Sequence, residues 1–403
     1  MKKLLLFIAI ILSGLAVKSQ AVLNVFEDWT SNAGSQNFFH KSITKTDGSG
    51  NVYVAGATVN GSGTYDILVA KYSNSGVQQW IQQYNGYGNY HDFATAVFVD
   101  GSGNVYITGT VTDSLLVQGS DIITMKYNSS GTLQWATRYN GSADYYDAGA
   151  DIAVDGSGNV YITGSIHTSA SYPFTDAIII KYNSSGTQQW ATVYNNTTYN
   201  KSEAGARIRL TSGGKAIISG VIQMTTNTYI YGVLEYNMST GAQIGGAALG
   251  TGTSNISYLG DLTIDVNNGC AYIAGAVYDS VTTGYDYYLV KLDSTLAVIW
   301  ERTYDGGSNL EDMANSVKVD GAGSVYVTGY TTNATQRKNI TTRKYNSSGG
   351  LVWTQTYNDT LNGDDAAMSM AIDADANIYI TGYDSTALGK TSNITIKYDR
   401  AGA

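Results

Sequence analysis

Three histidines are the side chains best suited to acid–base chemistry in this 403-residue sequence: His40, His91 and His167. We expect each of them in a loop on one face of the molecule. A histidine beside a carboxylate, as His91 stands beside Asp92, is an arrangement that a lyase, a hydrolase or a metal site uses. No GxSxG, HExxH or phosphate-loop motif accompanies them, so they are candidate catalytic residues without a supporting motif.

Acidic side chains recur at one position, seventeen residues before a repeated glycine. The five residues at this position are Asp92, Asp147, Glu203, Asp312 and Asp365. A ring of such carboxylates at the mouth of a channel would hold a cation or a basic group, and mutual repulsion would raise some of their pKa values. The alternative is that each carboxylate caps its own loop by accepting backbone N–H groups.

Tyrosine is abundant, with 33 residues, and many tyrosines fall in segments that differ from one repeat to the next. The tyrosines that we select as ligand-binding candidates, together with the acids above, are Tyr87, Tyr90, Tyr145, Tyr146 and Tyr172, and Tyr285 and Tyr287 extend the set. Aromatic rings beside Asn and Asp offer stacking faces and hydrogen-bonding groups to a sugar, a peptide or a protein surface. The alternative is that tyrosine is merely common in this chain.

A single turn resembles the start of a calcium-binding loop. Asp373, Asp375 and Asn377 alternate along the chain as oxygen ligands do in such loops, but the glycine and the glutamate that complete the motif are missing. Calcium is therefore the ion that we consider for this turn, and an ordinary turn capped by Asp373 is the alternative.

The elements that must position these residues are repeats. The string DGSGNVYITG occurs at residues 100–109 and 155–164, and degenerate copies end at Gly56, Gly220, Gly275, Gly329 and Gly382, which makes seven copies spaced by 53 to 56 residues. A Trp followed four residues later by Tyr keeps the same period, beginning at Trp80 and Trp135. Because these residues recur, we expect them to be structural, with the tryptophans packed between repeats and the recurrent lysines exposed or packed along their stems.

Each repeat reads as four short strands joined by glycine-rich turns, without helical periodicity. Seven four-stranded antiparallel sheets around an axis make an all-β, seven-bladed β-propeller. The last repeat stops at Ala403 without its Trp-bearing fourth strand. We therefore expect residues 22–29, which contain Trp29, to supply that strand, to close the ring and to leave no exposed sheet edge.

The repeat motif resembles the SBBP, or beta-propeller repeat, family of exported bacterial proteins, and more distantly the NHL-type propellers. The residues that carry the resemblance are the AVDGSGNVYITG string, the DIxxxKY string and the WxxxY pair, and together they extend over residues 22–403. The resemblance implies a propeller and brings no shared catalytic residues.

Composition and the N-terminus limit the possible functions. Lys2 and Lys3 precede the apolar residues 4–15, so we expect residues 1–19 to be a signal peptide and residues 20–403 to form the propeller. The formal charge of −9 argues against nucleic acid as a partner, no second segment predicts a membrane span, and the lone Cys270 excludes an intrachain disulfide.

We therefore predict a monomeric protein that is secreted or displayed at the cell surface, or else periplasmic. Its predicted function is non-catalytic binding or adhesion to a glycan or a protein. A propeller lyase or hydrolase and a structural spacer of the cell envelope are the alternatives.

Overall fold

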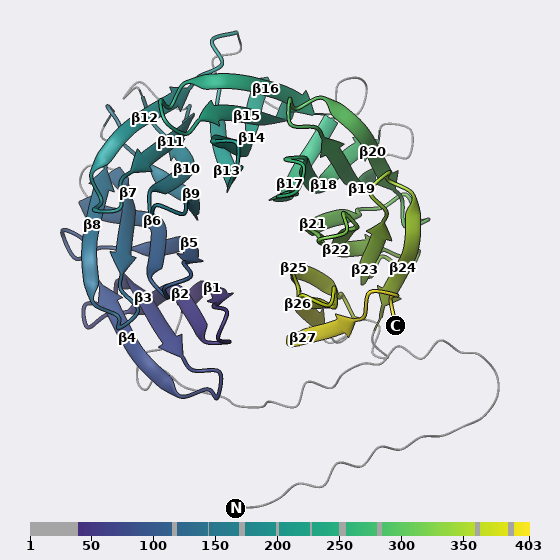
Figure 1. Cartoon of the computed structure of the whole chain (residues 1–403), viewed down its shortest axis with the longest axis horizontal. Coiled ribbons are helices and arrows are strands. Elements are labelled where there is room, and N and C mark those ends of the chain that lie inside the picture. Colours follow the sequence, from purple (N-terminus) through teal and green to yellow (C-terminus); the bar gives the residue numbers. More distant parts are fainter. Residues whose placement is uncertain are drawn as a thin grey trace, which may run out of the picture.

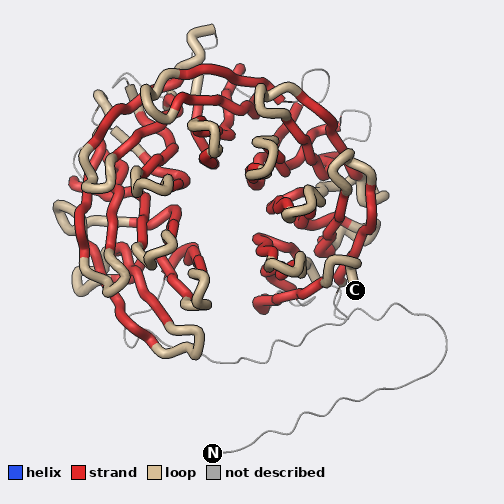
Figure 2. Tube along the Cα trace, viewed as in Figure 1, coloured by secondary structure: helices blue, strands red, loops and turns tan. Residues whose placement is uncertain are grey.

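The computed structural model describes residues 39–114, 119–143, 145–168, 174–198, 201–225, 228–249, 255–279, 284–358, 363–385 and 391–403. These residues form seven small antiparallel sheets, or blades, arranged around a central axis (Figure 1). Strands and loops make up all of the described chain (Figure 2), as the missing helical periodicity predicts. The predicted signal peptide and the predicted closing segment, residues 22–29, lie outside the described residues.

The strands of each blade follow chain order from the axis outward (Figure 1). Blades one to three comprise β1 (Phe39–Thr46), β2 (Val52–Val59), β3 (Tyr65–Tyr72), β4 (Gln78–Tyr84), β5 (Phe93–Val99), β6 (Val105–Ser114), β7 (Gly119–Tyr127), β8 (Leu133–Tyr139), β9 (Ala148–Val154), β10 (Val160–Ile166), β11 (Asp176–Tyr182) and β12 (Gln188–Tyr194). Blades four to six comprise β13 (Glu203–Leu210), β14 (Lys215–Thr225), β15 (Thr228–Asn237), β16 (Gln243–Leu249), β17 (Asn255–Ile264), β18 (Ala271–Asp279), β19 (Gly284–Leu292), β20 (Val298–Tyr304), β21 (Met313–Val319), β22 (Val325–Thr332), β23 (Lys338–Tyr345) and β24 (Leu351–Tyr357). Blade seven comprises β25 (Ala366–Ile372), β26 (Ile378–Ser385) and β27 (Thr391–Tyr398).

The repeated DGSG sequence forms the hairpin turn between the first two strands of a blade. In blade two, the Asp100 carboxylate accepts the backbone N–H groups of Ser102 and Asn104, both at 2.9 Å, and the Tyr106 hydroxyl at 3.1 Å. Gly103 has a φ of 76°, a conformation that glycine adopts at little cost. The turn therefore needs an acceptor at its start and a glycine three residues later, as the repeat supplies.

The repeated glycine on the second strand is required by a β-bulge on the first. In blade two the register shifts between Ala94 and Ala96, and a side chain at Gly109 would collide with the carbonyl oxygen of Phe93. Similar register shifts occur in the other innermost strands. Because a bulge re-aims the residues beside it, this irregularity sets which side chains of the innermost strands face the axis.

Neighbouring blades are joined by the repeated tryptophan, as predicted. The Trp135 indole N–H donates to the Ser184 carbonyl at 3.1 Å, and its ring lies where a side chain at Gly186 would be. Trp80, Trp190, Trp300 and Trp353 meet the equivalent turn glycine of the following blade in the same way. The repeated lysine lies over the repeated tyrosine of its own blade, as in the Lys126 and Tyr106 pair, 5.1 Å from nitrogen to ring centre.

Blade four departs from this pattern in several places at once. Ile244 of blade four stands where most other blades have the repeated tryptophan. The turn glycine that such a tryptophan would contact in blade five is replaced by Leu296. Leu296 keeps a left-handed φ of 66° and is buried. Glu235 replaces the lysine and forms an ion pair with Lys215 at 2.7 Å. Blade four thus changes both the contact between blades and the charged pair, while Ile244 itself stays 49% exposed.

Blade seven has three strands among the described residues, as the sequence predicts for its C-terminal end. On β27, Asn393 is exposed and Ile394 is half-buried, whereas the corresponding strands β3, β7 and β11 are buried along most of their length. The outer edge of blade seven is where we predict the N-terminal strand to pair.

Candidate functional site

The propeller has two faces, which are built from different connections. We call loop face the side formed by the segments between one blade and the next, such as residues 85–92, 140–147 and 305–312, and by the hairpins between second and third strands. We call turn face the opposite side, which carries the short DGSG and NSSG turns. Most residues that the sequence singles out lie on the loop face.

The five recurrent acids lie at the base of the loops that lead into the innermost strands, and all five are buried. Asp92 accepts the backbone N–H groups of Gly86 and of Thr112, the latter at 3.1 Å. Asp147 and Asp312 repeat this arrangement in their own blades. Asp365 accepts the N–H of Ser385 at 3.3 Å. The four aspartates therefore have the geometry of loop caps, the alternative considered above, and a role of the five acids as direct ligand contacts stays a prediction.

Burial changes the acidity of these groups. Loss of water raises the pKa of Asp92 and that of Asp312 to about 6, although backbone N–H groups bonded to each carboxylate act in the opposite direction. In Glu203, burial and then the neighbouring Asp176 carboxylate raise the pKa to about 7. Repulsion between the recurrent acids around a ring is not among the causes for Asp92, Asp312 or Glu203, because burial is the largest cause of the raised pKa in all three.

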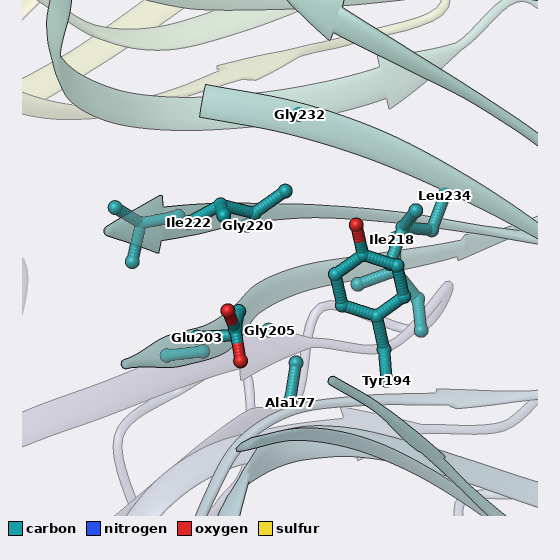
Figure 3. Close-up of a pocket in the computed structure, with 11 residues that line it drawn as sticks. Ala177, Tyr194, Glu203, Gly205, Ile218, Gly220, Ile222, Gly232 and Leu234 are labelled. Carbon is teal, nitrogen blue, oxygen red and sulfur yellow. The ribbon is translucent and has the colours of Figure 1, made fainter. Parts of the chain in front are cut away.

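Glu203 differs from the four aspartates at its position because its side chain is longer. The carboxylate reaches a cavity of about 20 Å³ lined by Ala177, Tyr194 and Ile222 (Figure 3). Among the described residues, neither of its oxygens has a hydrogen-bond partner of regular geometry. A cavity of this size is large enough for about one water molecule and too small for a sugar or a peptide.

The candidate tyrosines are placed unequally. Tyr87 is 68% exposed and Tyr146 is 49% exposed, both on the loop face. Tyr145 is half-buried and meets Tyr146 edge to face, with 5.7 Å between ring centres. Tyr90 is half-buried. Tyr172 lies outside the described residues.

Tyr285 and Tyr287 also differ in their exposure to solvent. Tyr285 is exposed, whereas Tyr287 is buried in the core between blades five and six. The expectation of a loop position for Tyr287 was therefore wrong: it lies within β19 and points into the blade interface.

The histidines do not share a common contact among the described residues. His91 is exposed, accepts the Tyr65 N–H through Nδ1 at 3.2 Å and packs against the Tyr65 ring. His167 is buried behind Tyr145, and its Nδ1 lies 2.6 Å from the Tyr146 carbonyl oxygen. The side chain of His40 lies outside the described residues.

The turn that resembles a calcium loop uses its oxygens internally. Asp373 accepts the backbone N–H groups of Asp375 and Asn377, the Asn377 side-chain amide and the Tyr379 hydroxyl, at 2.8 to 3.1 Å. This is the bonding of the Asp100 turn in blade two. In the described part of the chain, no three His, Cys, Asp or Glu side chains are grouped as metal ligands would be. The Asp373 turn therefore has the geometry of an ordinary capped turn.

The axis holds a charged cluster that the sequence analysis missed. Arg209 on β13 bridges Asp151 of β9 at 2.7 Å and Asp261 of β17 at 3.2 Å. Lys318 on β21 also reaches Asp261, at 2.6 Å. These cations hold the pKa of Asp261 well below its usual range, against the effect of burial.

A signal for this cluster was present in the repeats. Lys45, Arg209 and Lys318 all stand eleven residues before the repeated glycine, where blade two has Phe98 and blade three has Ala153. Comparing the innermost strands position by position would have found the charged residues at a place that other blades fill with apolar ones.

Family comparison identifies the repeat. The model described as SBBP, beta-propeller repeat, matches residues 79–112 and 134–169. The chain thus carries SBBP repeats, the family that its motif resembles. A comparison with curated protein sequences finds no match. No helix able to span a lipid bilayer occurs in the described ranges.

Solved structures share the fold at low sequence identity. The propeller domain of the Trilobed protease from Pyrococcus furiosus, whose reported topology is an open velcro, aligns with a TM-score of 0.51 and 9% identity over 91% of this chain and 98% of that one. A PL25 ulvan lyase, bound to -[GlcA(1-4)Rha3S]-, aligns with a TM-score of 0.51 and 13% identity over 89% and 90%. A quinohemoprotein alcohol dehydrogenase from Pseudomonas putida HK5 aligns with a TM-score of 0.51 and 12% identity over 88% of this chain and 66% of that one. At these identities the likeness concerns the fold alone.

Proposed function

We propose that this propeller of SBBP repeats is an exported, non-catalytic binding or adhesion module whose loop face presents tyrosines to a glycan or a protein. The observation that carries the proposal is the exposure of Tyr87 and Tyr146 on loops that are otherwise held firmly in place. A large aromatic ring gains stability when it is buried, so rings held in solvent on an ordered loop indicate a surface that a partner covers.

The hydrogen bonds beneath Tyr146, in the connection between blades two and three, explain how such a surface is preorganised. Asp147 is buried directly behind Tyr146 and bonds the N–H groups of Gly141 and His167. The Asp147 N–H in turn donates to the Ser120 carbonyl at 2.7 Å. The carboxylate therefore fixes the loop from below, and the two tyrosines above it lose little freedom when a ligand stacks on them.

The repeat architecture adds a second advantage for adhesion. Equivalent loops lie at fixed positions around the ring: Tyr87 and Tyr146 come from two different connections between blades, and Tyr285 is exposed near the loop-face end of β19. A polymeric ligand can engage several of them at once, so weak individual contacts sum to a higher avidity. Export fits this role, and the signal-like pattern of residues 1–19 supports it.

A glycan array tests the proposal. We expect the purified protein to bind a defined subset of glycans, and the double variant Tyr145→Ala, Tyr146→Ala to lose that binding by about tenfold or more, since aromatic hot spots each contribute about 2 kcal/mol. Val266→Ala is the matched control, because Val266 is the most exposed apolar side chain of the turn face, at 78%.

Equal binding by the double variant and the wild-type protein would contradict the loop-face proposal. If the folded wild-type protein binds no glycan, the sugar part of the proposal is wrong. An array of extracellular proteins then tests the protein part with the same pair of variants.

A further inference from the structure

We propose that the axial channel of the propeller is a binding site for an acidic sugar, with Arg207 as the main contact for its carboxylate or sulfate group. Arg207 lies on β13 inside the ring and belongs to none of the tyrosine-bearing loops. This site therefore stands apart from the loop-face proposal, and either one can fail without the other.

The first observation is a cavity that spans the innermost strands of several blades. It has a volume of about 350 Å³, and Ile43 of β1, Thr95 of β5, Ala150 of β9 and Arg207 of β13 are on its wall. β1, β5, β9 and β13 are the innermost strands of their blades (Figure 1), so the cavity that they share lies near the axis. Its volume is within the range of pockets that hold small ligands, about 300–1,000 Å³.

The second observation is the chemistry of the wall. Among the described residues that line this cavity, Arg207 is the one charged side chain and Thr95 the one uncharged polar side chain. The other lining residues, including Phe93, are apolar. The Arg207 guanidinium donates a hydrogen bond to the Ala206 carbonyl at 3.0 Å. A guanidinium has five N–H donors in a planar fork, which matches a carboxylate or a sulfate. An apolar wall beside such a fork suits the face of a sugar ring.

The third observation is an excess of positive charge around the channel. Two carboxylates, Asp151 and Asp261, lie among these charges and form ion pairs with Arg209 and Lys318. The cations number four: Lys45, Arg207, Arg209 and Lys318. No described carboxylate forms an ion pair with Lys45 or Arg207. In a chain of net charge −9, this local excess attracts an anion to the axis.

Lys45 provides the supporting charge. It stands two residues after Ile43 on β1, so both side chains are on the same side of that strand. Lys45 remains in contact with solvent, yet the channel wall removes part of its water and thereby lowers its pKa. Repulsion from Arg209 and Lys318 lowers this pKa further, and attraction to Asp151 and Asp261 acts in the opposite direction. A bound anion would relieve this repulsion.

A second cavity, of about 970 Å³, opens on the turn face and contains Lys45 and Lys318. Arg400 lines it as a third cation, and Asp320, Asp373 and Asp375 line it as well, so its charges are balanced. The proposal therefore rests on the Arg207 cavity, where the arginine has no acidic neighbour among the described lining residues.

Calorimetric titration of the full chain at constant ionic strength tests the site with three probes: glucuronic acid, glucose and inorganic sulfate. We expect saturable binding of glucuronic acid, at least about tenfold weaker binding of glucose, and displacement of glucuronic acid by sulfate. Arg207→Gln should weaken glucuronic acid binding by about tenfold or more, and Lys45→Gln by a smaller factor. Arg207→Lys should retain part of the affinity, because the charge remains and the fork is lost.

Arg337→Gln is the control for loss of a cation, since Arg337 is 42% exposed and lies in a hairpin of the loop face. It should leave the affinity unchanged. Thermal unfolding of each variant verifies that it is folded.

The proposal is overturned if the folded wild-type protein binds no anionic probe, if glucose binds as well as glucuronic acid, or if Arg207→Gln and Arg337→Gln have the same effect. Binding of sulfate without any binding of glucuronic acid would also overturn it, because the site would then take a free ion and not a sugar.

Discussion

The contact between a tryptophan and the turn glycine of the next blade predicts a specific steric effect. In Gly186→Ala, the new Cβ would lie 2.6 Å from Cδ2 of Trp135, well inside the contact distance. Gly186 also has a φ of 82°, which an alanine adopts only with strain. The variant therefore combines two costs, and a second glycine separates them.

Gly63 is the matched control because its φ is 81° and no atom lies within 4 Å of an added Cβ. The left-handed conformation costs an alanine about 1–2 kcal/mol at either position. At Gly186 the overlap with Trp135 adds about 1–3 kcal/mol, the usual cost of overpacking. We therefore expect Gly186→Ala to lower the free energy of unfolding by about 1–3 kcal/mol more than Gly63→Ala does.

Urea unfolding followed by circular dichroism measures this difference, with equal m-values as the condition for comparison. Trp135→Leu in the Gly186→Ala background should recover part of the loss, since residues in contact do not act additively. The pair Ile244 and Leu296 is the natural version of that double change. Equal effects of Gly63→Ala and Gly186→Ala, or purely additive effects in the double variant, would refute the steric interpretation.

Two further predictions concern buried charges. Because the native state raises the pKa of Glu203 to about 7, it binds a proton more tightly than the unfolded chain does, so stability should fall as pH rises from about 5 to 8. Glu203→Gln should reduce that slope and be more stable than the wild-type protein at pH 8 by about 1–3 kcal/mol, and an unchanged slope in pH-dependent unfolding would contradict this. Arg209→Met should destabilise the protein by about 1–3 kcal/mol, because Asp151 would lose this cation and Asp261 would keep Lys318. A loss below about 1 kcal/mol in the same urea assay would mean that water already solvates these carboxylates.

The blades were predictable because their signals are local and repeated. Turn residues such as Asp100 and Gly103 mark the hairpins, and Trp135 with its partner glycine marks the contact between blades. Each of these residues acts on a neighbour at a fixed sequence distance, so the repeat period itself reveals the geometry.

The orientation of the site residues was not predictable in the same way. The spacing places Asp92 and Asp147 in the correct loops, but it does not tell whether a carboxylate faces the solvent or the backbone beneath it. The burial of Tyr287 depends on packing against the next blade, and a repeat motif does not record such packing. The axial cluster joins Asp151, Arg209 and Asp261 from three blades, a proximity that arises only when the ring is assembled.

Hydrogen exchange in the presence of the glycan that binds best on the array would locate the binding surface on the wild-type protein. We expect protection in the loops that precede Asp92 and Asp147, with the turns at Asp100 and Asp155 unchanged. Protection confined to the turn face or to the outer strands β4, β8 and β12 would contradict a loop-face binding module.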